Sequence, residues 1–181
     1  MTRPAAGFVA LLLAGAAAAT VARPVTVEQL AREADAVVQG RVTRMESRWA
    51  ADGRHIVTRV TVRVSRVLRG AAAGEVTLEI PGGAVGGFGQ RVDAAPSFEP
   101  GEEAVVFLRR TAAGRSLVHG LAQGKFRILE RADGSRVAVR SASDVALLQP
   151  GTGALLHGQG RTLLEYADLV AQIEAGRAGK R

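Results

Sequence analysis

The three histidines, His55, His119 and His157, are the side chains of this sequence best suited to bind a metal ion or to act as a general base near neutral pH. They are far apart along the chain, none belongs to a paired histidine motif, and the sequence contains no cysteine. A zinc site is therefore not predicted. Ser116 lies three residues before His119 in a predicted strand, so their side chains point to opposite faces and do not form a nucleophile–base pair. We expect neither a cofactor nor a catalytic site.

The segment Gly120–Phe126 is similar at first sight to a phosphate-binding loop. Its glycines, however, are separated by three residues rather than four, and Phe126 stands where such a loop needs a Ser or Thr to hold magnesium. The pattern favours glycines at which a barrel strand turns a corner, with Lys125 at the surface.

The segment from residue 82 to residue 100 has no strand or helix pattern, and it contains five glycines between positions 82 and 89. Irregular segments longer than about 12–15 residues are uncommon and are often functional. We predict that this Gly-rich segment is a binding loop in which Val85, Phe88 and Arg91 contact a partner. The alternative is a loop that folds over the end of a barrel, with Phe88 as a plug.

The chain is strongly basic, with 24 Lys and Arg against 17 Asp and Glu and a formal net charge of +7 at pH 7. This charge predicts attraction to an anionic partner, although a compositional bias toward arginine would produce the same excess. Arg59 and Arg63, which face outward on a predicted strand, are the candidate residues for such attraction. Nucleic acid is not expected as a partner, because five Phe, one Trp and one Tyr offer few platforms on which bases could stack.

Residues 1–22 have the features of a cleaved signal peptide. Arg3 supplies a positive charge, and the apolar run Ala5–Ala19 that follows has 15 residues, fewer than the roughly 20 that a membrane-spanning helix needs. Small residues allow cleavage after Ala19 or after Ala22. We therefore expect a secreted or periplasmic protein without a membrane span after cleavage. An uncleaved N-terminal anchor is the alternative.

Alternation of apolar and polar residues predicts a mostly β domain over residues 23–145. The clearest strand runs from His55 to Leu68, where valines at positions 60, 62 and 64 alternate with polar residues. The alternation changes phase near Ser65–Arg66, which predicts a β-bulge. Trp49 is expected to be half-buried scaffolding at the mouth of a hairpin. Further strands are predicted over the ranges 36–49, 75–80, 103–109, 116–130 and 136–140, of which 116–130 is broken by Gly120 and Gly124. Asp-Gly hairpin turns are predicted at 51–54 and 132–135.

A helix is predicted on each side of this domain. Thr26 and Gln29 form a capping box for a short helix that ends near Asp35. Residues 146–181 are expected to contain a loop, an amphipathic helix and a basic tail. The second helix is predicted to start at another capping box, Thr162–Glu165, to continue through Glu174 and to be capped by Gly176.

The order of these elements resembles that of a known family. The residues that carry the resemblance are Ala34–Val38, Gly40–Val42, the alternating valine strand that ends at Val67–Gly70, Glu75–Leu78, Pro100–Glu103 and Val105–Leu108. Over residues 26–130 this pattern is similar to the N-terminal domain of tissue inhibitors of metalloproteinases and to netrin-type modules, and also to secreted bacterial proteins with the same start. The resemblance implies an OB-fold barrel and a protein-binding role. The family inhibits through an N-terminal cysteine, and this chain has none, so no inhibitory residue is transferred to it.

The sequence therefore predicts an all-β protein with flanking helices, an OB-like barrel of five to six strands. We expect an exported, non-catalytic binding module that contacts a protein through residues 82–100. The alternatives are an inhibitor or chaperone of a secreted metalloprotease and a binder of acidic glycans or of the cell envelope. An enzyme with a site assembled from scattered residues is the least favoured class.

Overall fold

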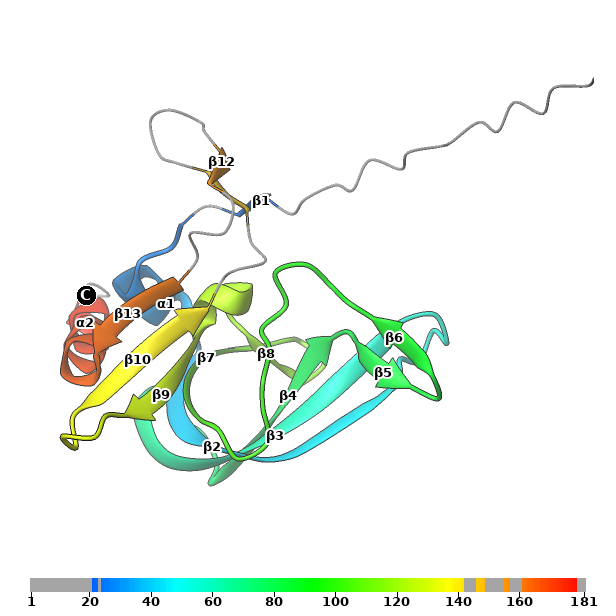
Figure 1. The fold of residues 1–181 in the computed structure, drawn as a ribbon, viewed down its shortest axis with the longest axis horizontal. Helices are drawn as coiled ribbons and strands as arrows, with labels where there is room; N and C mark the ends of the chain where they lie inside the picture. Colours follow the sequence, from blue (N-terminus) through cyan, green and yellow to red (C-terminus); the bar gives the residue numbers. More distant parts are fainter. Residues whose placement is uncertain (1–20, 23, 142–145, 149–154, 157–160, 179–181) are drawn as a thin grey trace, which may run out of the picture.

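The computed structural model describes residues 21–22, 24–141, 146–148, 155–156 and 161–178 (Figure 1). The predicted signal peptide, apart from Val21–Ala22, and His157 lie outside the described residues. The strands are β1 (Val21–Ala22), β2 (Ala36–Trp49), β3 (Ile56–Arg69), β4 (Glu75–Pro81), β5 (Gly83–Val85), β6 (Phe88–Gln90), β7 (Glu103–Arg110), β8 (Ser116–Val118), β9 (Lys125–Glu130), β10 (Arg136–Ser141), β11 (Ala146–Leu148), β12 (Leu155–Leu156) and β13 (Arg161–Glu165). The helices are α1 (Val27–Glu33), the 3-10 turn η1 (Leu121–Gly124) and α2 (Tyr166–Ala178).

Strands β2 and β3 form the long curved hairpin on which the fold is built. Val60 and Val62 are 1% exposed, whereas Arg59 and Arg63 on the other face are exposed, as the alternation predicted. Gln39 pairs with Arg66 and Gly40 pairs with Val64, so Ser65 has no partner in the ladder. This confirms the bulge, which restores the phase of the alternation and bends the strand.

The barrel closes through β8. The closed order is β2, β3, β4, β8, β7 and back to β2, with β4 parallel to β8 and the other pairs antiparallel. This is a five-stranded OB-like barrel, so the predicted fold class is confirmed. Its interior is filled by apolar side chains from all five strands, and Phe98 packs into the same core from the segment before β7.

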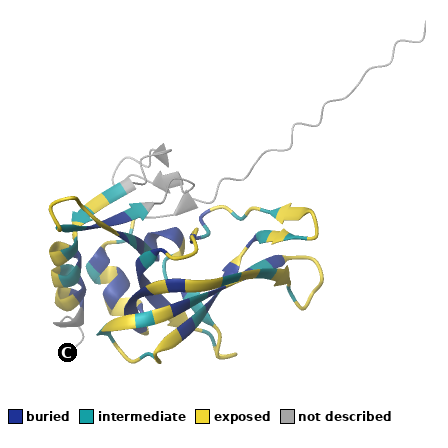
Figure 2. Cartoon of the chain, turned by 60° about the horizontal axis from the view of Figure 1, so that its bottom comes forward, coloured by how far each residue is buried: buried dark blue, intermediate teal, exposed yellow. Residues whose placement is uncertain are grey.

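A second sheet extends from the barrel. Strand β9 pairs with the N-terminal part of β7, on the same edge of β7 whose C-terminal part pairs with β8. Beyond β9 the sheet continues with β10 and then β13. Helices α1 and α2 pack against this extension and form a second core with Val37, Phe107 and Phe126. Figure 2 shows these buried positions between the sheet and the helices, while the ends of the projecting hairpins are exposed.

The predicted break of the range 116–130 at Gly120 and Gly124 is confirmed, because Gly120 (φ 76°) and Leu121 (φ 55°) reverse the chain into η1, which ends at Gly124 and separates β8 from β9. Two other details of the predicted C-terminal half are wrong. Residues 161–165 form strand β13 rather than a capping box, since pairing with β10 outweighs the local helix signal. Gly176 does not cap α2 but lies within it. A Cβ there would come 2.6 Å from the Glu28 carbonyl oxygen of α1, so the glycine lets the helices approach.

The N-terminal prediction is confirmed for α1. The Thr26 hydroxyl accepts from the Gln29 backbone N–H, the Gln29 side chain accepts from the Thr26 backbone N–H, and Val27, Leu30 and Ala31 are buried. Strand β1 pairs with β11, so cleavage after Ala19 would retain β1 and cleavage after Ala22 would remove it. None of the described helices is both long enough and apolar enough to span a membrane.

Candidate functional site at the barrel mouth

The Gly-rich segment is not irregular throughout, because its first half forms the short β5–β6 hairpin. Gly86 and Gly87 have φ values of 55° and 84°, and a two-residue type I′ hairpin turn requires a positive φ at both of its central positions. Gly83 lets the hairpin approach the barrel, since a Cβ there would come 2.4 Å from the Thr58 hydroxyl oxygen and 2.5 Å from that of Ser47. The sequence pattern missed this hairpin because its strands have only three residues each.

The β5–β6 hairpin lies beside the tip of the β2–β3 hairpin (Figure 1). The Ile56 backbone N–H donates to Gln90 Oε1 at 2.6 Å, and the Gly82 N–H donates to the Ile56 carbonyl oxygen at 2.8 Å. The rings of Trp49 and Phe88 meet edge to face, with 5.9 Å between their centroids. Trp49 is 41% exposed and Phe88 is 66% exposed, so Phe88 does not plug the barrel. We call these two rings, together with Val85, which pairs with Phe88 across the hairpin, the aromatic tip.

A groove of about 340 Å³ opens between the barrel mouth and residues 90–98, and the base of the β5–β6 hairpin, Gly83 and Gln90, forms part of its lining. Phe98, rather than Phe88, closes the barrel, and it forms part of the groove wall together with Met45, Val60 and Ile80. Arg91 lies at the exposed rim of the groove. Pockets of this size with apolar walls and few polar groups are typical of ligand sites in the mouths of β-barrels.

The structure places Val85 and Phe88 opposite each other in the β5–β6 hairpin and Arg91 at the groove, but it places Arg59 and Arg63 elsewhere. Val60 faces the groove, so its neighbour Arg59 faces the opposite side of β3. Arg59 is in register with Glu46 on one side and Glu79 on the other, and Arg63 is in register with Glu75. On the outer surface of the barrel Arg59 is thus flanked by two carboxylates, whereas Arg63 is flanked by Glu75 and by Arg41.

The Asp52 carboxylate orders the turn of the β2–β3 hairpin. It accepts from the backbone N–H groups of Arg54 at 2.9 Å and His55 at 3.1 Å, and its other oxygen lies 2.5 Å from His55 Nδ1. The Arg54 N–H, followed by the His55 ring and the His55 N–H, lowers the pKa of Asp52 from 3.8 to about 2.

The pKa of Asp52 predicts a small acid-sensitive contribution to stability. Because the pKa is lower in the folded protein, the contribution is complete above about pH 4 and disappears as the pH falls through about 2. The wild-type chain should therefore have a higher thermal midpoint than Asp52→Asn at about pH 5 and lose this advantage near pH 2. A difference between the two midpoints that does not change with pH would contradict this account.

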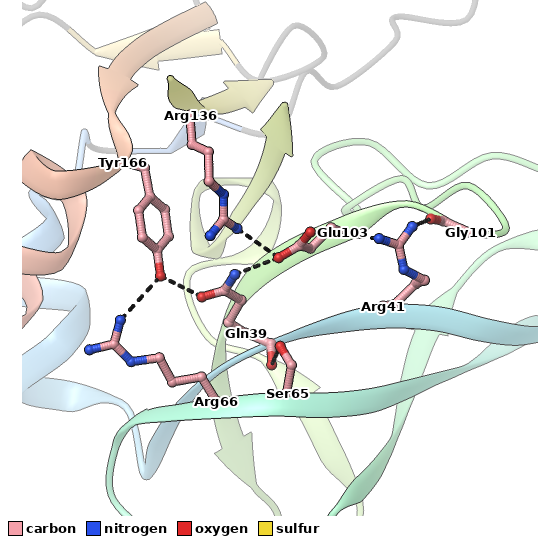
Figure 3. Close-up of polar contacts among 8 residues, drawn as sticks. All are labelled: Gln39, Arg41, Ser65, Arg66, Gly101, Glu103, Arg136 and Tyr166. Carbon is pink, nitrogen blue, oxygen red and sulfur yellow. Dashed lines mark hydrogen bonds and ion pairs between the residues drawn. The ribbon is translucent and has the colours of Figure 1, made fainter. Parts of the chain in front are cut away.

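A polar network connects helix α2 to strands β2, β7 and β10 (Figure 3). The Tyr166 hydroxyl of α2 donates to Gln39 Oε1 at 2.5 Å, and Gln39 Nε2 donates to Glu103 Oε1 at 2.5 Å. Arg136 donates to the same Glu103 oxygen at 2.7 Å and stacks 4.4 Å from the Tyr166 ring centroid. Gln39 is 4% exposed, so the network satisfies a buried amide and fixes α2 on the barrel. No sequence motif indicated it, because its members come from four separate elements.

A second polar site was also missed. Lys125 is not at the surface: its side chain is 11% exposed, and Nζ lies 2.8 Å from Glu102 Oε1, a carboxylate whose side chain is 1% exposed. Nζ also donates to the Ser97 carbonyl oxygen at 2.9 Å and lies 4.9 Å from the Phe98 ring centroid. Lys125 thus links β9 to the segment that closes the barrel.

The described histidines have separate surroundings. His55 contacts Asp52 in the exposed turn, and His119 Nε2 lies 3.1 Å from Glu33 Oε2 beside α1. Within the part of the chain that the structure describes, no group of three or more His, Asp or Glu side chains is placed to hold a metal ion.

The fold and this site define a class of protein: a five-stranded OB-like barrel with a helical second layer and an apolar groove beside two exposed aromatic rings. Comparison with protein-family models and with curated protein sequences found no match.

Proposed function

We propose that this chain is an exported, non-catalytic module that binds an exposed segment of a partner protein at the groove and the aromatic tip. The observation that carries the proposal is the exposure of the Trp49–Phe88 pair next to an open groove. Exposed aromatic residues beside a pocket are the usual anchors of protein interfaces, because their rings bury a large apolar area at a small entropic cost.

The chemistry of the site indicates what the partner segment carries. The walls formed by Met45, Val60, Ile80 and Phe98 suit one bulky apolar side chain. Arg91 at the rim favours an acidic residue next to that anchor. The resemblance to metalloproteinase inhibitors makes an exported protease one candidate source of the segment.

The proposal is tested by selecting displayed peptides on the mature chain. We expect selected peptides to combine a bulky apolar residue with a neighbouring Asp or Glu, and Phe88→Ser to weaken their binding by about 30-fold, as removal of an interface anchor does.

Leu163→Ser is the matched control, because Leu163 is 58% exposed on β13, far from the groove in the strand order. This control variant should bind the selected peptides as the wild type does. Failure to select any peptide, or equal binding by wild type and Phe88→Ser, would overturn the proposal.

A further inference from the structure

A second cavity of about 240 Å³ lies between residues 96–99 and strand β9, and it shares Pro96 and Ser97 with the lining of the groove. Leu129 and Val139 form part of its apolar wall, and four charged side chains line it: Glu99, Glu102, Lys125 and Arg127. The four charges form two ion pairs that differ strongly in exposure, and this difference determines what the cavity can bind.

The inner pair is buried and incompletely satisfied. Lys125 Nζ donates to Glu102 Oε2 at 2.9 Å. Glu102 Oε1 lies 2.8 Å from the same Nζ but outside hydrogen-bonding geometry, and it finds no hydrogen-bond donor among the described residues. A buried carboxylate oxygen without a donor is uncommon in folded proteins. Because this oxygen is fully buried, a ligand hydroxyl or ammonium group in the cavity would satisfy it once the Glu102 carboxylate turns toward the cavity.

The outer pair is exchangeable. Arg127 Nη1 lies 2.8 Å from Glu99 Oε2, and the two side chains are 41% and 63% exposed. Exposed ion pairs of this kind contribute little to stability. A ligand carboxylate can therefore replace Glu99 on Arg127, because Glu99 returns to water and no buried charge is left unpaired.

Arg127 lies close to the same carboxylate, since its Nε is 3.9 Å from Glu102 Oε2, the oxygen bonded to the same carbon as Oε1. A ligand that uses both must carry its carboxylate and its donor on neighbouring atoms, with a short carbon skeleton against Leu129 and Val139. We infer that this cavity binds a small carboxylate that has a hydroxyl or ammonium group one or two carbons away. Such a group occurs in free hydroxy acids and amino acids and in the uronic acid units of acidic glycans.

The inference is tested by titrating the mature chain with L-lactate, D-glucuronate, propionate and glucose while amide chemical shifts are followed. We expect lactate or glucuronate to shift the amides of residues 99–102 and 125–127 at millimolar concentration. Propionate lacks the donor and glucose lacks the carboxylate, so both should bind at least about tenfold more weakly. Tighter binding of glucuronate would identify a sugar acid as the ligand, and tighter binding of lactate a free hydroxy acid.

Two variants should change the affinity in opposite directions. Arg127→Gln should weaken binding at least about tenfold, because it removes the charged donor. Glu99→Gln should strengthen it severalfold, because the competing carboxylate is gone. Arg131→Gln and Glu165→Gln, which alter another exposed ion pair with 2.8 Å between its charged atoms, should change nothing. The inference is overturned if no probe binds up to about 20 mM, or if Glu99→Gln and Arg127→Gln bind as the wild type does.

Discussion

Replacing Lys125 with methionine should lower the free energy of unfolding by about 3–5 kcal/mol. The change leaves the Glu102 carboxylate, 1% exposed, in the interior without its ammonium partner. It also removes the hydrogen bond to the Ser97 carbonyl oxygen, which holds the segment before Phe98 against β9. Arg127, whose Nε lies 3.9 Å from Glu102 Oε2, offsets part of this loss. Urea unfolding of the purified protein measures the effect, with an unchanged m value as the sign that the folded state is otherwise intact.

The double variant Glu102→Leu with Lys125→Met separates the charge from the packing. It should recover most of the stability, because apolar side chains of similar volume often replace a buried ion pair without cost. Arg131→Met is the matched surface control. Its partner Glu165 is 48% exposed, and the expected loss is about 1 kcal/mol or less. If the single and the double variant lose the same free energy, the pair matters for packing rather than for charge.

Phe107→Ala is expected to cost about 3–5 kcal/mol, because it opens a cavity in the second core. Phe107 is fully buried on β7, and its ring centroid lies 6.0 Å from that of Phe126 on β9. Val37 of β2 and Leu169 and Ile173 of α2 belong to the same cluster, so the loss affects the helical layer as well as the sheet. Domains of this size have only about 5–15 kcal/mol of stability, and the variant should be close to unfolding at 37 °C.

Phe88→Ala makes the same chemical change at a side chain that is 66% exposed. It should change the free energy of unfolding by about 0.5 kcal/mol or less. Such a contrast would show that the Phe88 ring is dispensable for folding, as the proposed partner surface requires. A large loss of stability in Phe88→Ala, or a negligible one in Phe107→Ala, would contradict the assignment of the two residues to surface and core.

The local pattern was sufficient for several elements whose own residues decide their structure. The alternating valines of β3 predicted which face is buried, and the change of phase predicted the bulge at Ser65. The capping box at Thr26 and the Asp-Gly turns were also predicted, because each depends on hydrogen bonds or dihedral angles within a few residues. The exposure of Phe88 on a glycine-rich segment was one of two alternatives that the sequence left open.

The long-range pairings determined the rest. Residues 161–165 carry a helix-start signal and yet form β13, because the open edge of β10 provides hydrogen bonds that a single turn of helix does not. Lys125 lies inside the protein because the side chain of Glu102, which stands 23 residues earlier and just before β7, contacts its ammonium group once β9 has paired with β7. Charge and alternation along one strand do not contain this information. The sequence by itself thus determined a basic, cysteine-free, mostly β chain with a curved central hairpin, whereas the tertiary structure alone decided where the groove, the aromatic tip and the buried ion pair lie, because each combines residues that only strand pairing brings together.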